Sequence, residues 1–239
     1  DEGRIGKIYH WRGAYLQSWI MDPSFPRTWH LQKEKAGSGP QGDLNSHSVD
    51  LARYLVGDIK SVVAMTANFI TDRPLPDEEA SGTFSGKSKG TETGKVTVED
   101  AAFMTVEFEN GALGSFEATR FATGRKNYNY FEIYGDKGAV IFDFERMNEL
   151  KFYSTEDPDY AQGFRTIIAT EESHDYIANW WPPGHIIGYE HEFIHAAYDF
   201  LVALDQDKPI EPNFYDGMKE MEVLDAGLQS AEKGKKITL

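Results

Sequence analysis

The sequence predicts an α+β fold: an open-faced, predominantly antiparallel β-sheet with helices packed on one face. Three observations predict it: a helical pattern near the start, a run of short strands joined by tight turns, and helical patterns near the C-terminal end. Strands and helices do not alternate as in nucleotide-binding sheets, so we expect no Rossmann domain within these 239 residues. A chain of this size is expected to form a single domain over residues 1–239.

The first predicted elements are a long strand and a helix. Residues 7–19 are rich in aromatic side chains and predict the strand. A glycine-rich turn at 37–42 leads into a helix from Asp43 to Leu55, which Gly57 ends. Four apolar side chains of this helix are expected to be buried: Leu44, Leu51, Leu55 and Val56. Residues 59–71 predict the next strand.

A break in composition separates this part from a ladder of strands. Residues 72–95 are rich in Gly, Ser, Thr, Glu and Pro, which predicts a mobile loop within the domain because strands resume directly afterwards. Asn110-Gly111 indicates a hairpin turn in the ladder. The five strands expected there are 100–108, 112–121, 128–134, 139–144 and 150–154.

The C-terminal part predicts helices and a closing strand. Apolar residues recur at helical spacing at Phe193, Ala196, Ala197, Phe200, Leu201 and Leu204. A last helix is expected over 216–232, and residues 237–239 could add a strand to the sheet.

Composition excludes several classes of function. The formal net charge of −15 argues against a nucleic acid or an anionic membrane as the main partner. The chain has no cysteine, which excludes disulfides, thiolate catalysis and Cys-ligated zinc. No apolar run approaches the roughly 20 residues that span a bilayer, and the first residues do not read as a signal peptide. A cytoplasmic protein is therefore expected.

The first candidate for chemistry is the pair Asp43 and His47. Their spacing of four residues places both side chains on one face of a helix. A carboxylate near a histidine handles protons, because histidine titrates near neutral pH and the carboxylate orients the ring. A solvated helix face has the same spacing, so the pattern alone leaves both interpretations open.

A second candidate is the H-E-x-x-H motif from His191 to His195. Two histidines at this spacing on a helix ligate zinc in some hydrolases, with the intervening glutamate, here Glu192, activating water. A third ligand is needed, and Glu220 or Glu222 of a later helix could supply it. Both histidines lie off the apolar stripe of their helix, so we expect them to face solvent without a metal. A zinc-dependent hydrolase stays an alternative.

Several motifs together resemble the C-terminal domain of the Gfo/Idh/MocA oxidoreductases, in particular sugar or inositol dehydrogenases. The most specific is the D-x-x-x-H helix of Asp43 and His47, with its glycine-rich lead and its end at Gly57. The supporting segments span nearly the whole chain: 2–7, Trp29-His30, 98–100, 132–135 with Gly138, and 216–230. The resemblance implies an open antiparallel sheet domain that follows a Rossmann domain, which is absent from this chain.

The resemblance also implies roles for individual residues. His47 matches the catalytic acid/base on the reacting hydroxyl, and Asp43 matches the catalytic aspartate that assists it. Trp29 and His30 match a Trp-Arg pair beside the cofactor, which would be NAD or NADP bound mainly by the missing domain. Because His30 replaces the arginine, its contact to the cofactor is expected to be weaker or pH-dependent.

A sugar or polyol is the substrate that the resemblance implies. Gln17 and Trp19 share a strand face, and similar positions contact the sugar in sugar-dehydrogenase relatives. An aromatic platform with an amide suits such a molecule, although ordinary sheet packing would explain both residues. His185, in a loop similar to one of sugar-oxidising relatives, is expected to line the same site. The outer sheet face is expected to build a homo-oligomer, either a dimer or a tetramer.

The function implied is hydride transfer from a secondary hydroxyl of a sugar or cyclitol to a nicotinamide. His47 would take the hydroxyl proton, assisted by Asp43 and by a lysine that this chain lacks. The chain alone is therefore expected to be inactive. The sequence does not choose between NAD and NADP, and a non-catalytic assembly or binding module stays a further alternative.

Overall fold

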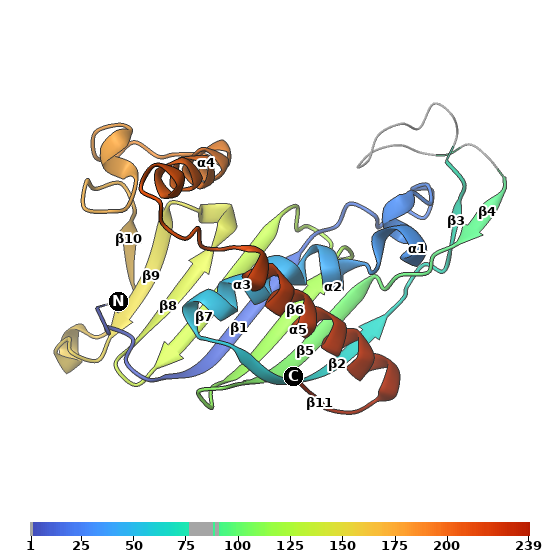
Figure 1. Cartoon of the computed structure of the whole chain (residues 1–239), viewed down its shortest axis with the longest axis horizontal. Coiled ribbons are helices and arrows are strands. Elements are labelled where there is room, and N and C mark those ends of the chain that lie inside the picture. The colour runs from blue at the N-terminus through green and yellow to red at the C-terminus, as the bar shows by residue number, and fades with distance from the viewer. Residues whose placement is uncertain (1, 77–87, 89–90) are drawn as a thin grey trace.

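A nine-stranded sheet forms the centre of the fold in the computed structural model, which describes residues 2–76, 88 and 91–239. The strand order is β10-β9-β8-β7-β1-β6-β5-β2-β11 (Figure 1). The strands are β1 (Ile8–Leu16), β2 (Ile59–Ala67), β5 (Ala101–Phe108), β6 (Leu113–Thr119), β7 (Tyr128–Gly135), β8 (Gly138–Asp143), β9 (Glu149–Ser154), β10 (Arg165–Ile168) and β11 (Ile237–Thr238). Neighbouring strands are antiparallel, except that β1 and β6 run parallel. The predicted sheet type is confirmed.

Helices cover one face of this sheet, as predicted. Helices α2 (Pro40–Asp43), α3 (Asn45–Leu55) and α5 (Phe214–Lys233) lie across it, while α1 (Lys33–Ala36) lies toward one end (Figure 1). The described residues also include four short 3₁₀ segments: η1 (Trp29–Leu31), η2 (Phe144–Arg146), η3 (Asp159–Ala161) and η4 (Ile177–Asn179). The core lies between helices and sheet, and its buried members include Trp11, Val49, Phe108, Phe116 and Leu224. Alternate strand residues supply the sheet's share of it, because successive side chains point to opposite faces.

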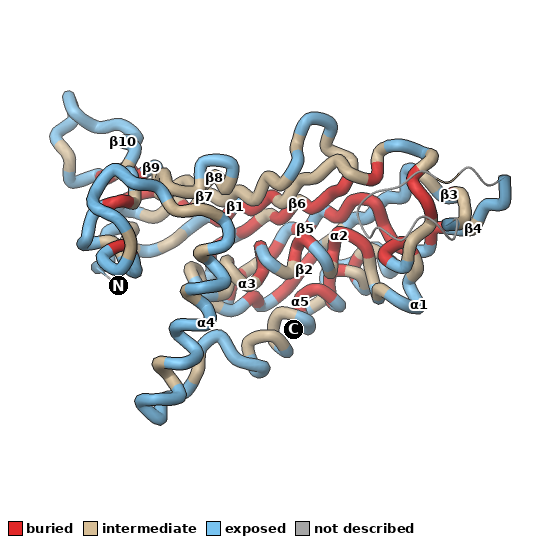
Figure 2. The backbone as a smooth tube through the Cα atoms, turned by 90° about the horizontal axis from the view of Figure 1, so that it is seen from above, coloured by how far each residue is buried: buried red, intermediate tan, exposed pale blue. Residues whose placement is uncertain are grey.

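Helix α4 (Glu190–Asp205) stands apart from this core and buries none of its own residues. Figure 2 shows it exposed over most of its length, projecting away from the sheet. The helical spacing over 193–204 correctly predicts a helix. However, the apolar stripe that would normally face a core is exposed, at 63% for Phe193, 63% for Leu201 and 58% for Leu204. In the described part of the chain, this stripe faces solvent.

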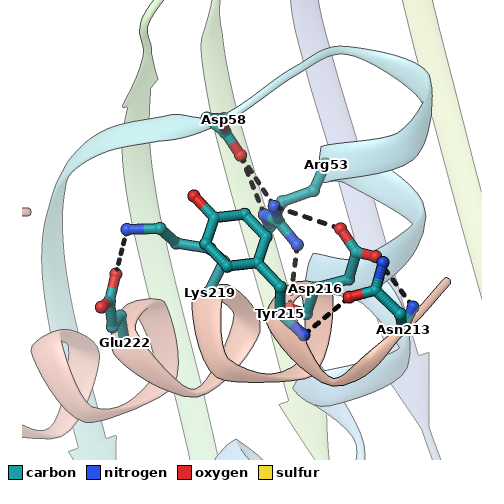
Figure 3. Close-up of polar contacts among 7 residues, drawn as sticks. All are labelled: Arg53, Asp58, Asn213, Tyr215, Asp216, Lys219 and Glu222. Atoms are coloured by element: carbon teal, nitrogen blue, oxygen red, sulfur yellow. Dashed lines mark hydrogen bonds and ion pairs between the residues drawn. The ribbon is translucent and has the colours of Figure 1, made fainter. Parts of the chain in front are cut away.

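Polar contacts fasten the start of α5 to the end of α3 (Figure 3). Asn213 caps α5 by accepting from the main-chain N–H of Tyr215, and the Asp216 carboxylate accepts from the main-chain N–H of Asn213. Arg53 of α3 donates to Asp58 at 2.9 Å and to the main-chain carbonyl of Asp216 at 3.0 Å. Helices α3 and α5 are thus held together by a partly buried guanidinium as well as by apolar packing.

The expected loop over 72–95 begins and ends in paired strands. β3 (Asp72–Pro74) pairs with β4 (Thr93–Lys95) in a separate two-stranded ribbon. Arg73 is fully buried and donates to the main-chain carbonyls of Ile20 and Asp22, which anchors the ribbon. The loop prediction is therefore wrong at both ends, since a tertiary anchor rather than an apolar pattern makes these strands. Residues 77–87 and 89–90, the centre of the predicted loop, lie outside the described residues.

The remaining predicted elements are found within a few residues of their expected bounds, and strand β10 is an addition. β10 pairs with the edge strand β9, in a stretch whose sequence shows no strand alternation. None of the helices that the structure describes has the length and apolar run needed to cross a bilayer.

Candidate active site

Helices α2 and α3 carry the two predicted catalytic residues. Asp43 is the last residue of α2 and His47 lies in the first turn of α3, with Leu44 between the helices. The predicted single helix therefore starts earlier, at Pro40, and is interrupted at Leu44. Because the main chain of Leu44 stays in the right-handed helical region, Asp43 and His47 keep the spacing of one helical turn. Both are exposed.

The start of α2 is fixed by a buried carboxylate. One oxygen of Glu99 accepts the main-chain N–H of Gly39 at 2.8 Å and that of Gln41 at 2.9 Å. These donors are unpaired within a helix, so the carboxylate caps it and suits the positive end of its dipole. Gly39 allows this approach, because a Cβ there would lie 2.0 Å from the Glu99 main-chain oxygen. The turn before Asp43 therefore has a defined geometry.

Asp43 is paired with an arginine that the sequence did not suggest. Nη2 of Arg120 donates to Oδ2 of Asp43 at 2.6 Å. The Arg120 side chain is only 1% exposed, whereas that of Asp43 is 48% exposed. The contact therefore runs from the protein interior to the surface. Charge-assisted pairs of this length orient a carboxylate strongly.

His47 lies beside the end of strand β1 rather than against the Asp43 carboxylate. Its ring meets that of Tyr15 edge-on, with 5.5 Å between centroids. Asp43 and His47 are not hydrogen-bonded to each other in the described part of the chain. The helical spacing therefore does not bring the Asp43 carboxylate into contact with the His47 ring. Arg120 orients the carboxylate instead.

A chain of hydrogen bonds links the predicted sugar-contacting residues. Trp19 donates from Nε1 to Oε1 of Gln17 at 2.8 Å, and Gln17 donates from Nε2 to Oδ1 of Asn127 at 3.0 Å. The Tyr15 hydroxyl donates to the same Asn127 oxygen at 2.7 Å. Burial, and then the nearby Tyr189, raise the pKa of Tyr15, so the phenol stays neutral and keeps its proton. These contacts join β1 to the connection between β6 and β7.

Trp29 and His30 form a stacked pair near these residues. Their ring centroids are 3.6 Å apart, and the edge of His30 faces Trp19 at 5.9 Å. Trp29 is exposed and His30 is buried. Burial, and then the charge of Arg120, lower the pKa of His30, while Asp43 opposes the shift. His30 is therefore neutral at neutral pH and presents no positive charge to a cofactor.

His185 is the predicted site residue that the structure does not bring to the others. Its Nδ1 lies 2.8 Å from the carbonyl of Pro182, and its ring is near that of Trp181. Both partners belong to its own exposed loop. A role for His185 beside Gln17 and Trp19 stays a prediction.

The H-E-x-x-H histidines take part in an aromatic cluster. Nε2 of His195 accepts from the indole of Trp180 at 2.8 Å, and its ring stacks on Tyr176 at 4.3 Å. Nδ1 of His191 accepts the main-chain N–H of Gly188 at 3.1 Å. The expectation that both face solvent is wrong, since they are partly buried while the apolar stripe is exposed. Among the described residues, no three acidic or histidine side chains are grouped to hold a metal.

Three residues of the site escape a sequence analysis. β1 ends at Leu16, so Gln17 and Trp19, which were predicted to share a strand face, lie past its end, and Tyr15 is the member of this group within the strand. Arg120 and Asn127 lie on the connection after β6, where nothing local distinguishes them from other polar loop residues. Their part in the site depends on the parallel pairing of β1 with β6.

Comparison with known proteins places this arrangement in a family. The model of the GFO/IDH/MocA C-terminal domain matches residues 1–141. The chain belongs to the GFO/IDH/MocA family. The resemblance seen in the motifs is therefore confirmed, and so is the fold that it implied.

Individual relatives of this GFO/IDH/MocA domain are similar along its whole length. The levoglucosan dehydrogenase of Pseudarthrobacter phenanthrenivorans is 42% identical over 236 residues, which cover 98% of this chain and 60% of that protein. The crystal structure of an oxidoreductase domain protein from Kribbella flavida matches with a TM-score of 0.91 at 45% identity, covering 99% of this chain and 60% of that one. A levoglucosan dehydrogenase in complex with NADH and levoglucosan matches with a TM-score of 0.89 at 40% identity, covering 100% and 60%. The chain thus spans 60% of the length of these relatives.

Proposed function

We propose that this chain forms the substrate side of an NAD(H)-dependent dehydrogenase that oxidises a secondary hydroxyl of a sugar. The observation that carries the proposal is the exposed carboxylate of Asp43, oriented by the buried Arg120, one helical turn from the exposed His47. The relatives support the reaction class, since two similar structures are levoglucosan dehydrogenases in complex with NADH and a sugar, levoglucosan or L-sorbose.

His47 is proposed to take the proton of the reacting hydroxyl. A histidine is suited to this step because its ordinary pKa, near 6.5, lies close to neutral pH. The fixed Asp43 carboxylate would accept a hydrogen bond from the substrate and favour the positive charge that develops on the imidazole. Both side chains reach solvent, so a substrate can approach them.

The linked residues Gln17, Trp19 and Asn127 are proposed to hold the sugar. Amide groups match hydroxyls as donors and acceptors, and an indole face packs against the apolar C–H groups of a sugar ring. The hydrogen bonds among the three fix the amide orientations before a ligand arrives, which lowers the entropic cost of binding.

Trp29 and His30 are proposed to face the cofactor. A flat, uncharged aromatic surface with a neutral imidazole fits a nicotinamide ring, and the exposed Trp29 provides that surface. When bound, the nicotinamide supplies the acceptor for the hydride. The Rossmann domain expected to bind the rest of NAD(H) is not part of this fold, so the isolated chain is proposed to be inactive.

The test is an assay of the full-length protein. We expect absorbance at 340 nm to rise when NAD⁺ is mixed with levoglucosan or a related sugar, and the same mixture with the 239-residue chain to give no change. Absence of NAD⁺-linked oxidation over a panel of sugars, cyclitols and glucosides in an enzyme that binds NADH would reject the proposal.

We further propose that the sheet face opposite the helices joins two copies of the chain. Exposed apolar side chains gather there on adjacent strands: Val63, Met65, Phe103 and Leu113. Such a patch on a soluble protein is typical of a protein interface. Light scattering of the full-length protein is expected to give a dimer or tetramer, and the Phe103→Asp variant a smaller species. A monomeric wild type would reject this assignment.

A further inference from the structure

Arg120 occupies a position that is unusual for a charged side chain. It directly follows β6, its main-chain N–H donates to the carbonyl of Asp100 at 3.3 Å, and its side chain is almost fully buried. Its guanidinium carbon lies 5.3 Å from the ring of Trp19. Arginine is rarely buried to this degree unless its charge is paired and its donors are satisfied.

Arg120 uses one of its three side-chain nitrogens for pairing. Nη2 donates to Asp43, while Nε and Nη1 have no hydrogen-bond partner among the described residues. Arginine–carboxylate pairs frequently use the guanidinium fork for two parallel bonds, which makes them stronger. A buried cation with unpaired donors adds little to stability and can even reduce it.

The geometry therefore favours a role in function over a role in folding. The single strong bond reaches out of the core to the half-exposed carboxylate of Asp43, which is proposed to meet the substrate. The contact of the guanidinium with the Trp19 ring and its burial limit the freedom of the Arg120 side chain, which helps to fix the direction of the bond.

We infer that Arg120 is a positioning residue, which acts through Asp43 to hold that carboxylate in the orientation needed for proton transfer with His47. This inference rests on the proposed function. It also gives the connection after β6 a part in the site that neither the motifs nor the names of the relatives assign.

The test compares variants in the full-length enzyme. Arg120→Met removes the charge and the bond at similar length, and Arg120→Lys keeps the charge but loses the fork. Arg125→Met is the matched control, because Arg125 lies on the same connection and pairs with Glu145 at 2.7 Å. We expect Arg120→Met to lower kcat by about tenfold to hundredfold with a smaller change in KM, since a misplacement of about 1 Å costs up to about a hundredfold. Arg120→Lys should fall between, and Arg125→Met should match the wild type.

A double-mutant cycle with Asp43→Asn separates positioning from a structural role. If Arg120 acts through Asp43, then Arg120→Met should change kcat by less than about twofold once Asp43 is already Asn. Equal effects in both backgrounds, or an unchanged kcat in the single variant, would overturn the inference. Should Arg120→Met fail to fold, Arg120→Lys takes its place in the cycle with the same two outcomes.

Two readouts do not depend on turnover. The melting temperature of Arg120→Met should stay within about 3 °C of the wild type or rise, whereas Asp43→Ala, which leaves the buried cation unpaired, should melt lower. Proton NMR should show the pKa of His30 rising in Arg120→Met and not in Arg125→Met, because Arg120 lowers it. An unmoved His30 titration would show that the Arg120 charge does not occupy the buried position from which it reaches Asp43, and would overturn the inference.

Failure of this inference differs from failure of the proposed function. If Asp43→Asn keeps full activity, the proposed role of Asp43 is wrong, and the inference is overturned with it. If Asp43→Asn is impaired and Arg120→Met is not, the dehydrogenase site stands and only the positioning role is overturned.

Discussion

Helices α2 and α3, on one side, and helix α4, on the other, carry similar chemical groups in different surroundings. Asp43 and His47 sit on helices that are anchored in the core by buried residues such as Leu44 and Val49. Glu192 and His195 sit on a helix with no buried residue. At the first place a buried arginine orients an exposed carboxylate; at the second, aromatic rings surround the histidines.

The difference shows that the residues packed around a helix determine whether an acid and a histidine one turn apart can act on a ligand. At α2 and α3, the core fixes the helices and leaves the polar side chains open to a ligand. At α4, the imidazole nitrogens of His191 and His195 already accept hydrogen bonds, while the apolar stripe is exposed. Pre-organisation of polar groups on a rigid scaffold is what catalysis requires.

The largest expected effect is on turnover. His47→Ala in the full-length enzyme should lower kcat by about 10²- to 10⁴-fold, because it removes the proposed general base. The matched variant His195→Ala should lower kcat by less than about threefold, since His195 lies in the aromatic cluster. Steady-state kinetics with NAD⁺ and the best sugar measures both. If both variants lost kcat to a similar extent, the proposed difference between the two helices would be wrong. A larger loss of kcat in His195→Ala would place the catalytic histidine on α4 instead.

The second effect is on stability. Leu44 is 3% exposed, so Leu44→Ala should lower the free energy of unfolding by about 2–5 kcal/mol. Leu204→Ala on α4 should change it by less than about 0.5 kcal/mol, because that side chain is exposed in this chain. Urea denaturation of the 239-residue chain gives both values. An equal loss for Leu204→Ala would show that α4 packs more tightly than its exposure indicates.

The third effect is on the pH dependence of stability. Burial, and then the charge of Asp50, raise the pKa of Glu220 to about 7, so the folded protein holds this proton more tightly than the unfolded chain does. Its contribution is complete below the unfolded pKa of about 4.5 and is lost as the pH rises through about 7.

We expect Glu220→Gln to remove roughly 1 kcal/mol of the pH-dependent part of the free energy of unfolding. This value is smaller than the full pKa shift implies, because Glu220 is only half-buried and solvent screens its charge. Partial loss of solvent also raises the pKa of Glu192 on α4, so Glu192→Gln should act in the same direction. Its effect should be smaller, because no neighbouring carboxylate adds to the shift. Melting temperatures between pH 5 and pH 8 test this order, and a pH profile that Glu220→Gln leaves unchanged would refute it.

The smallest expected effect concerns metal. Equimolar zinc should shift the melting temperature by less than about 1 °C, because ligands stabilise only what they bind. Metal analysis of the purified protein checks the same point, with His191→Ala as the control. Zinc bound in a 1:1 ratio and lost in that variant would restore the hydrolase alternative.

Much of the fold was predictable because local patterns and tertiary structure agree. Strands β5 and β6 have a clear alternation and a hairpin turn, and α5 has an apolar stripe, so their bounds were found within two or three residues; the capping box of Asn213 and Asp216, at which α5 starts, was missed. The ribbon of β3 and β4 was not predicted. Arg73 holds it through the main-chain carbonyls of Ile20 and Asp22, and no local sequence pattern indicates these contacts.

For the candidate site, the sequence supplied the residues of one motif but not their partners. Asp43 and His47 follow from a single helical turn, and Trp29 and His30 were found through the resemblance, while their stacking is seen only in the structure. The bond from Arg120 to Asp43 joins residues 77 positions apart and exists only because the end of β6 passes beneath α2. Pairings of this kind depend on sheet topology, which periodicity does not determine.

The parallel pairing of β1 with β6 has a consequence for how the protein is made. β1 is synthesised before the other strands of this sheet, yet both of its partners, which begin at Leu113 and Tyr128, follow much later. Until then its two edges have no native partner strand, and Trp11 lacks its ring contacts with Phe116 and Phe131. The two halves of the sheet meet only at β1. The complete sheet can therefore form only after most of the chain has been synthesised, and contacts between residues so distant in sequence slow folding.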